Sequence, residues 1–121
     1  MNEQSTVLSA ITQARILIVD DVEINLLMIE KTLRARGFHN LEKAINGQDA
    51  IDRAVTNPPD LIILDIQMPV MDGFECCSHF RALPRHATTP ILIQTVLTQP
   101  EMRFKAFTHG ATDIVSKPID A

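Results

Sequence analysis

Carboxylates follow two short apolar runs of this 121-residue chain. Asp20 and Asp21 come directly after residues 16–19, and Asp65 comes directly after residues 61–64. Both runs are typical of buried strands, and ligand sites of open α/β sheets lie at the carboxyl ends of such strands. Three carboxylates gathered there would repel one another and raise each other's pKa. A hard cation relieves that repulsion, and Mg²⁺ prefers oxygen ligands, so the pattern predicts a magnesium site.

Two later strands are expected to bring a hydroxyl group and an ammonium group to the same edge. Thr95 follows the strand expected at 91–94, and Lys117 follows a short strand at 113–116. This set suits phosphoryl transfer to a carboxylate, with an aspartate as the nucleophile. Catalysis of that reaction is mostly positioning and charge stabilisation, which Mg²⁺, the ammonium group and the hydroxyl group would supply.

The rest of the pattern predicts the elements that position these residues. Strands are expected near 15–20, 40–45, 61–65, 91–94 and 113–116, and helices near 23–36, 47–56, 73–82 and from 98–101 to Gly110. Strand–helix alternation with short loops predicts parallel strands joined by right-handed crossovers. The strand at 61–65 is apolar on both faces, which is typical of a parallel sheet covered on both sides. No helix is predicted after the last strand.

Composition excludes several classes of protein. The length suggests one domain, in which residues 1–14 form a leader or a short helix. A net charge of −4 argues against nonspecific binding to nucleic acid or anionic membranes. No apolar run is long enough to span a bilayer. The adjacent residues Cys76 and Cys77 are poorly placed for a disulfide, which favours a reducing, cytoplasmic setting.

Several features along the chain characterise one family when they occur together. They are Asp20-Asp21 with Asn25, the segment Leu64-Asp65-Ile66-Gln67-Met68-Pro69-Val70-Met71-Asp72-Gly73, then Thr95, and the segment from Gly110 to Lys117-Pro118. Over about residues 15–118 the chain resembles response-regulator receiver domains, the CheY-like module of two-component signalling. The resemblance implies a doubly wound α/β fold, with a five-stranded parallel sheet in the flavodoxin-like order 2-1-3-4-5. It also implies a cis bond between Lys117 and Pro118.

The resemblance also implies a function. Asp65 would accept a phosphoryl group from a histidine kinase or a histidine phosphotransfer protein. The domain would then switch conformation and control a target protein or a fused output domain. It would catalyse only its own phosphorylation and dephosphorylation, and so would not be an enzyme in the ordinary sense.

The same resemblance assigns roles within the site. Asp20, Asp21, Asp65 and the backbone carbonyl of Gln67 would bind Mg²⁺. Thr95 and Lys117 would contact the phosphoryl group on Asp65. Asn25 is interpreted as a structural residue of the first helix. Four histidines are expected at the surface and two phenylalanines in the core: His39, His79, His86, His109, Phe104 and Phe107.

The sequence departs from the family in three places. Val96 stands where a small residue is usual, and Ile114 stands where an aromatic ring usually takes part in the switch. The usual fifth helix is missing or truncated, so residues 15–121 are expected to form a receiver domain that leaves apolar surface of its first and fifth strands open. Either the chain is a fragment of a longer protein, or something else covers that side of the sheet. We expect a homodimer, or residues 5–13, to cover that face.

Other functions remain open at this stage. A pseudo-receiver would act as an interaction module without phosphate. A phosphatase of the haloacid dehalogenase type also uses an aspartate at a strand end, although Gln67 replaces its second acid. A flavodoxin-like FMN carrier would have its phosphate repelled by acids after the first strand.

Overall fold

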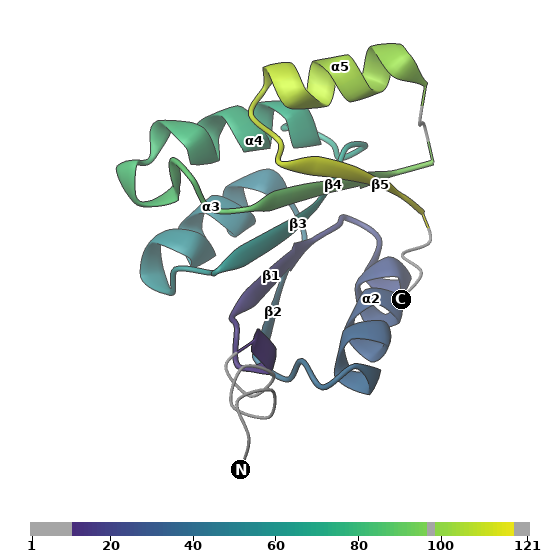
Figure 1. Ribbon diagram of the computed structural model, residues 1–121, viewed down its shortest axis with the longest axis vertical. Coiled ribbons are helices and arrows are strands. Elements are labelled where there is room, and N and C mark those ends of the chain that lie inside the picture. The colour runs from purple at the N-terminus through teal and green to yellow at the C-terminus, as the bar shows by residue number, and fades with distance from the viewer. Residues whose placement is uncertain (1–10, 97–98, 118–121) are drawn as a thin grey trace.

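The computed structural model describes residues 11–96 and 99–117, in which five parallel strands form one sheet (Figure 1). The strands are β1 (Ile16–Val19), β2 (Leu41–Ala44), β3 (Leu61–Asp65), β4 (Ile91–Thr95) and β5 (Asp113–Ser116). Their order across the sheet is β2-β1-β3-β4-β5, which confirms the predicted fold class. The central strands β1 and β3 lie side by side in register, with Val19 opposite Leu64.

Four helices follow the first four strands. They are α2 (Glu23–Ala35), α3 (Gly47–Thr56), α4 (Gly73–Ala82) and α5 (Pro100–Thr108), and a short 3₁₀ helix, η1 (Pro84–His86), follows α4. Two of these helices begin at side-chain caps, which satisfy backbone N–H groups of the first turn. Asn46 accepts from the N–H of Asp49 at the start of α3, and Asp72 accepts from the N–H of Glu75 at the start of α4.

The helices cover the two faces of the sheet unequally (Figure 1). The larger core lies on the side of α3, α4 and α5 and includes Phe74, Phe80 and alternate strand residues such as Leu17 and Leu64. The smaller core lies under α2, where Leu26 and Ile29 pack on β1 and β3. Of the four described helices, α2 alone covers its face.

The strands β4 and β5 are therefore incompletely covered on the α2 side. Leu92 pairs with Ile63, which belongs to the core under α2, so Leu92 and Gln94 point to that side as well. Val115 pairs with Gln94 and shares this face. Leu92 and Val115 are only half-buried. Among the described residues, the incompletely covered part of this face therefore lies at β4 and β5. The expectation that the first strand would also be open is wrong, because all of β1 is buried.

The N-terminal segment lies at the opposite edge of the sheet. Residues 11 and 12 are helical, and Asn40, just before β2, donates a hydrogen bond from Nδ2 to the carbonyl of Gln13. Residues 11–13 therefore do not cover the open face beside β5. The rest of that predicted cover, residues 5–10, lies outside the described residues, as does Pro118 with its predicted cis bond.

Two expectations about packing are wrong. Phe104 and Phe107 are 75% and 46% exposed, because Met102 and Ala106 form the side of α5 that packs on the core. His86 is 2% exposed, with its ring edge-on to Phe80 and its Nδ1 2.9 Å from Thr89 Oγ1. The 3₁₀ helix η1, which follows no simple apolar period, turns this histidine inward.

Candidate functional site

The three predicted acids meet at the carboxyl edge of the sheet. One oxygen from each of Asp20, Asp21 and Asp65 lies within 4.8 Å of the others. Asp20 and Asp65 are neighbours because they extend β1 and β3, whose preceding residues are paired. Both are buried, whereas Asp21 is exposed to solvent. Three close carboxylates with hard oxygen donors are a set that fits Mg²⁺.

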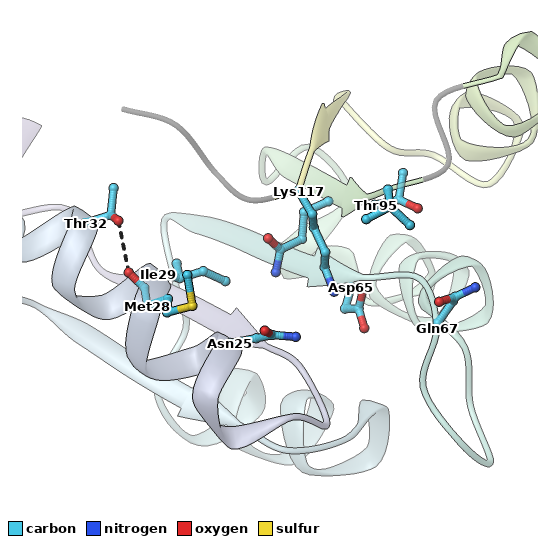
Figure 2. A pocket seen from close by; sticks show the side chains of 10 residues that line it. Asn25, Met28, Ile29, Thr32, Asp65, Gln67, Thr95 and Lys117 are labelled. Atoms are coloured by element: carbon cyan, nitrogen blue, oxygen red, sulfur yellow. Dashed lines mark hydrogen bonds and ion pairs between the residues drawn. The ribbon is translucent and has the colours of Figure 1, made fainter.

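Lys117 joins these acids from the last strand. Its Nζ lies 2.8 Å from Oδ1 of Asp65 and 3.3 Å from Oδ2 of Asp20. The backbone N–H of Lys117 donates to the carbonyl of Thr95, which fixes the end of β5 against the end of β4. Figure 2 shows the Lys117 side chain reaching Asp65, with Thr95 close by. The predicted acids, lysine and threonine are therefore gathered in one site.

Burial and charge shift the pKa values of the central pair. Burial raises the pKa of Asp65, and the hydrogen bond from Lys117 only partly offsets this, while Asp20 and Asp21 add repulsion. Burial lowers the pKa of Lys117, but the attraction of Asp65 and Asp20 raises it by more. The net pKa of Lys117 is therefore above its ordinary value. Lys117 therefore stays charged, and its ammonium group is what makes an ionised Asp65 tolerable in this site.

Removal of that ammonium group by Lys117→Met is expected to lower the free energy of unfolding by about 2 kcal/mol at neutral pH. The loss arises because two buried carboxylates remain without a cation, and it is moderated because the Lys117 side chain is 21% exposed. It should shrink in acid, since protonation of Asp65 in the folded state removes the need for a cation. In the parent, the contribution of Lys117 to the free energy of unfolding should disappear as the pH rises through the raised pKa of Lys117. Urea unfolding at several pH values measures both trends.

Lys43→Met is the matched control for this prediction. Lys43 lies 3.0 Å from Glu30 on the surface, with its side chain 40% exposed. Loss of such a surface pair should cost less than about 1 kcal/mol. Equal losses in the two lysine variants, or a loss from Lys117→Met that does not shrink in acid, would contradict the role given to Lys117.

The segment after Asp65 is packed tightly against the site. The N–H of Gly73 donates to the carbonyl of Ile66 at 2.8 Å, so the first residue of α4 lies directly on the backbone of β3. A Cβ atom on Gly73 would lie 2.2 Å from the carbonyl oxygen of Asp65. This close approach requires glycine, and it fixes the backbone that carries the Asp65 carboxylate.

A cleft of about 510 Å³ opens beside the acids, between α2 and the ends of β3, β4 and β5. Its lining includes the site residues Asp65, Gln67, Thr95 and Lys117 together with Asn25, Met28, Ile29, Thr32, Gln94 and Val96 (Figure 2). Gln67 is exposed, as expected for a loop residue. Val96 also has an exposed side chain.

Two amide residues in this cleft were missed as site residues. Asn25 lies on the α2 wall of the cleft. Gln94 is buried, and its Nε2 has no hydrogen-bond partner among the described residues. Gln94 could have been noticed as the polar residue in the apolar run of β4. Asn25 could have been noticed from its position four residues after Asp21, one helical turn from the acids.

The fold and this site define a doubly wound α/β domain with an acidic, lysine-containing centre at its carboxyl edge. The model of the response regulator receiver domain family matches residues 16–121. The chain belongs to this family. Receiver domains typically bind Mg²⁺, in agreement with the acidic cluster described above.

Individual relatives agree with this assignment. Response regulator PleD of Caulobacter vibrioides is 37% identical over 107 residues, which cover 88% of this chain and 23% of PleD. The signal transduction histidine-protein kinase BarA of Escherichia coli is 32% identical over 123 residues, covering 98% of this chain and 13% of BarA. The solved structure of the Vibrio cholerae chemotaxis protein CheY4 superposes with a TM-score of 0.84 at 36% identity and covers 89% of each chain. This chain thus spans less than a quarter of PleD and of BarA.

Proposed function

We propose that Asp65 is the phosphoacceptor of this receiver domain and that a histidine kinase or a histidine phosphotransfer protein is the donor. The observation that carries the proposal is the contact of 2.8 Å between Lys117 Nζ and Asp65 Oδ1, inside a cluster of three carboxylates. A nucleophilic carboxylate beside a fixed cation and a divalent-metal site is the arrangement that phosphoryl transfer needs.

In the proposed reaction, an oxygen of Asp65 attacks the phosphorus atom of the phosphohistidine. A new O–P bond forms as the N–P bond breaks, and the imidazole leaves with the electron pair of that bond and takes up a proton. Lys117 would hold the charge on the transferred group, and the Thr95 hydroxyl would donate to one of its oxygens. Asp20, Asp21, Asp65 and the carbonyl of Gln67 would hold Mg²⁺, which would neutralise part of the phosphoryl charge.

Phosphorylation would bias an equilibrium between two conformations of the domain. Thr95 is well placed to report on Asp65, because it ends β4 just before the segment that leads to α5.

The output would be a target protein or a fused domain, and the setting would be the cytoplasm. The similarity to a segment that makes up 13% of BarA supports a place within a longer chain. Pairing of two copies through the open face beside β5 is a further part of the proposal, as is the division into residues 1–14 and 15–121. Among the described helices, none is long and apolar enough to cross a membrane.

Incubation with Mg²⁺ and acetyl phosphate tests the proposal. Intact-mass measurement should show the gain of one phosphoryl group, and peptide mapping should place that group on Asp65. No uptake under conditions where the domain binds Mg²⁺ would favour a pseudo-receiver. Continued release of phosphate from phosphate esters would instead indicate a phosphatase.

Mg²⁺ itself is expected to stabilise the fold. A ligand that binds only the folded state at 100 times its Kd adds about 2.7 kcal/mol to the free energy of unfolding. Asp21→Asn should remove most of this gain, and it should leave the fold intact because Asp21 is exposed. Thermal unfolding in Mg²⁺ and in EDTA measures the effect. Asp60→Asn, a change at another exposed acid, should keep the full gain, and a parent protein that Mg²⁺ does not stabilise would contradict the metal site.

A further inference from the structure

One side of α2 faces the cleft beside Asp65. Four residues of α2 line it: Asn25, Met28, Ile29 and Thr32. Their spacing places them on one stripe of the helix. Met28 and Ile29 are apolar, and the hydroxyl of Thr32 is used within the helix, where it donates to the carbonyl of Met28. Figure 2 shows the amide end of Asn25 pointing toward Lys117 and Asp65, with Thr32 at the far end of the stripe.

Among the described residues, no bond of the Asn25 side chain accounts for this position. Asn25 is the third residue of α2, where a polar side chain can accept from the N–H of the N-cap residue, but that N–H, of Val22, donates to Oδ1 of Asp20 instead. Within residues 11–96 and 99–117, the Asn25 side chain is in no hydrogen bond or ion pair. Its amide therefore keeps two N–H groups available on the cleft side of the helix.

Phosphorylation would create the acceptors that this amide lacks. A phosphoryl group on Asp65 adds oxygens that carry negative charge and seek donors. Lys117 approaches the site from β5 and Thr95 from β4, whereas Asn25 approaches from α2, across the cleft. A neutral amide suits that side, because it donates without adding to the repulsion among the acids and without competing with them for Mg²⁺.

We propose that Asn25 is a further residue of the phosphorylated site, which donates a hydrogen bond from its side-chain amide to an oxygen of the phosphoryl group on Asp65. This inference rests on the proposed function of Asp65. It assigns to the first helix a direct contact with the phosphoryl group, in addition to the contacts made from the strand ends.

The test uses beryllium trifluoride, which mimics a phosphoryl group bound to a carboxylate oxygen. Its affinity for the full chain at saturating Mg²⁺ is measured by titration calorimetry or fluorine NMR. Asn25→Ala should weaken binding by about tenfold, the scale of one hydrogen bond to a charged group. Asn25→Asp, which keeps the shape but loses the N–H groups, should weaken binding at least as much. Thr32→Val, on the same stripe and in the same cleft, should bind like the parent.

Two further measurements separate this contact from a purely structural role. The unfolding temperature and the Mg²⁺ affinity of Asn25→Ala should match those of the parent, and parallel losses in these properties would overturn the proposal. Parental affinity for beryllium trifluoride in Asn25→Ala or Asn25→Asp would overturn it as well. Failure of the proposed function appears differently, as an absence of binding in the parent or as equal binding by Asp65→Asn.

Discussion

The Asp65→Asn variant is expected to take up no phosphoryl group from acetyl phosphate, while the parent takes up one. The neutral amide lacks the nucleophilic carboxylate oxygen, so the rate should fall by more than about a thousandfold. The side chain keeps its size, and its carbonyl oxygen can still accept the hydrogen bond from Lys117 that Oδ1 accepts in the parent. The loss should therefore be one of chemistry, with the fold retained. Intact-mass measurement over time, with circular dichroism of the same samples, checks both parts.

Asp72→Asn provides the matched control for this result. It makes the same chemical change to an acid seven residues further along, in the same segment. Asp72 caps α4 by accepting from the N–H of Glu75, and asparagine is an equally good cap. Asp72→Asn should therefore be phosphorylated like the parent. Uptake by Asp65→Asn at the parental rate would show that another residue is the acceptor.

Gly73→Ala should be among the most destabilising single substitutions in this domain. The added Cβ would lie 2.2 Å from the carbonyl oxygen of Asp65 and 2.7 Å from Cα of Ile66, which are backbone atoms that cannot move alone. The start of α4 would have to shift away from β3, and the hydrogen bond from the Gly73 N–H to Ile66 would be broken. We expect the free energy of unfolding to fall by about 3 kcal/mol. Phosphorylation at Asp65 should also decrease, because the backbone that carries Asp65 would move. Urea unfolding and the acetyl phosphate assay measure these two losses.

Gly47→Ala is the comparison that isolates the backbone clash. Gly47 is the first residue of α3, as Gly73 is of α4. The Cβ added to Gly47 would meet the side chain of Met71, with its sulfur at 2.7 Å. A methionine side chain can adopt another rotamer, so the loss should be only about 1 kcal/mol and phosphorylation should persist. Equal losses in the two variants would mean that contact with the Asp65 backbone is not what makes Gly73 important.

The acids and Lys117 could be placed from the sequence because their positions depend on one rule of the fold. Parallel strands deliver their carboxyl ends to the same edge, so an apolar run followed by a polar residue locates that residue without knowledge of any helix. The strand boundaries were predicted to within about two residues. For β1 and β3 the reason is that each is a short apolar run, whereas β2 and β5 contain charged or polar residues and were placed from the turn residues and helices around them.

Asn25 could not be assigned in the same way. The role that we propose for it depends on how α2 is rotated about its axis over β3, and apolar spacing gives that rotation only coarsely. Phe104 was misplaced because α5 has apolar residues on more than one side, so its sequence does not single out the face that packs on the sheet. His86 was misplaced because a 3₁₀ turn, rather than a regular helix or strand, carries it into the core. In each case the missing information was the orientation of one element against another.

The ion pair between Lys117 and Asp20 joins residues that lie 97 positions apart in the chain. During synthesis, the aspartates of β1 and β3 leave the ribosome well before the lysine that pairs with them. β4 and its threonine also come before that lysine, so the cation is the last component of the site to arrive. An incomplete chain would thus hold its acids without their cation, and the proposed acceptor would lack the charge that supports phosphoryl transfer. Competence to be phosphorylated would then mark a domain whose strands have all been made and paired.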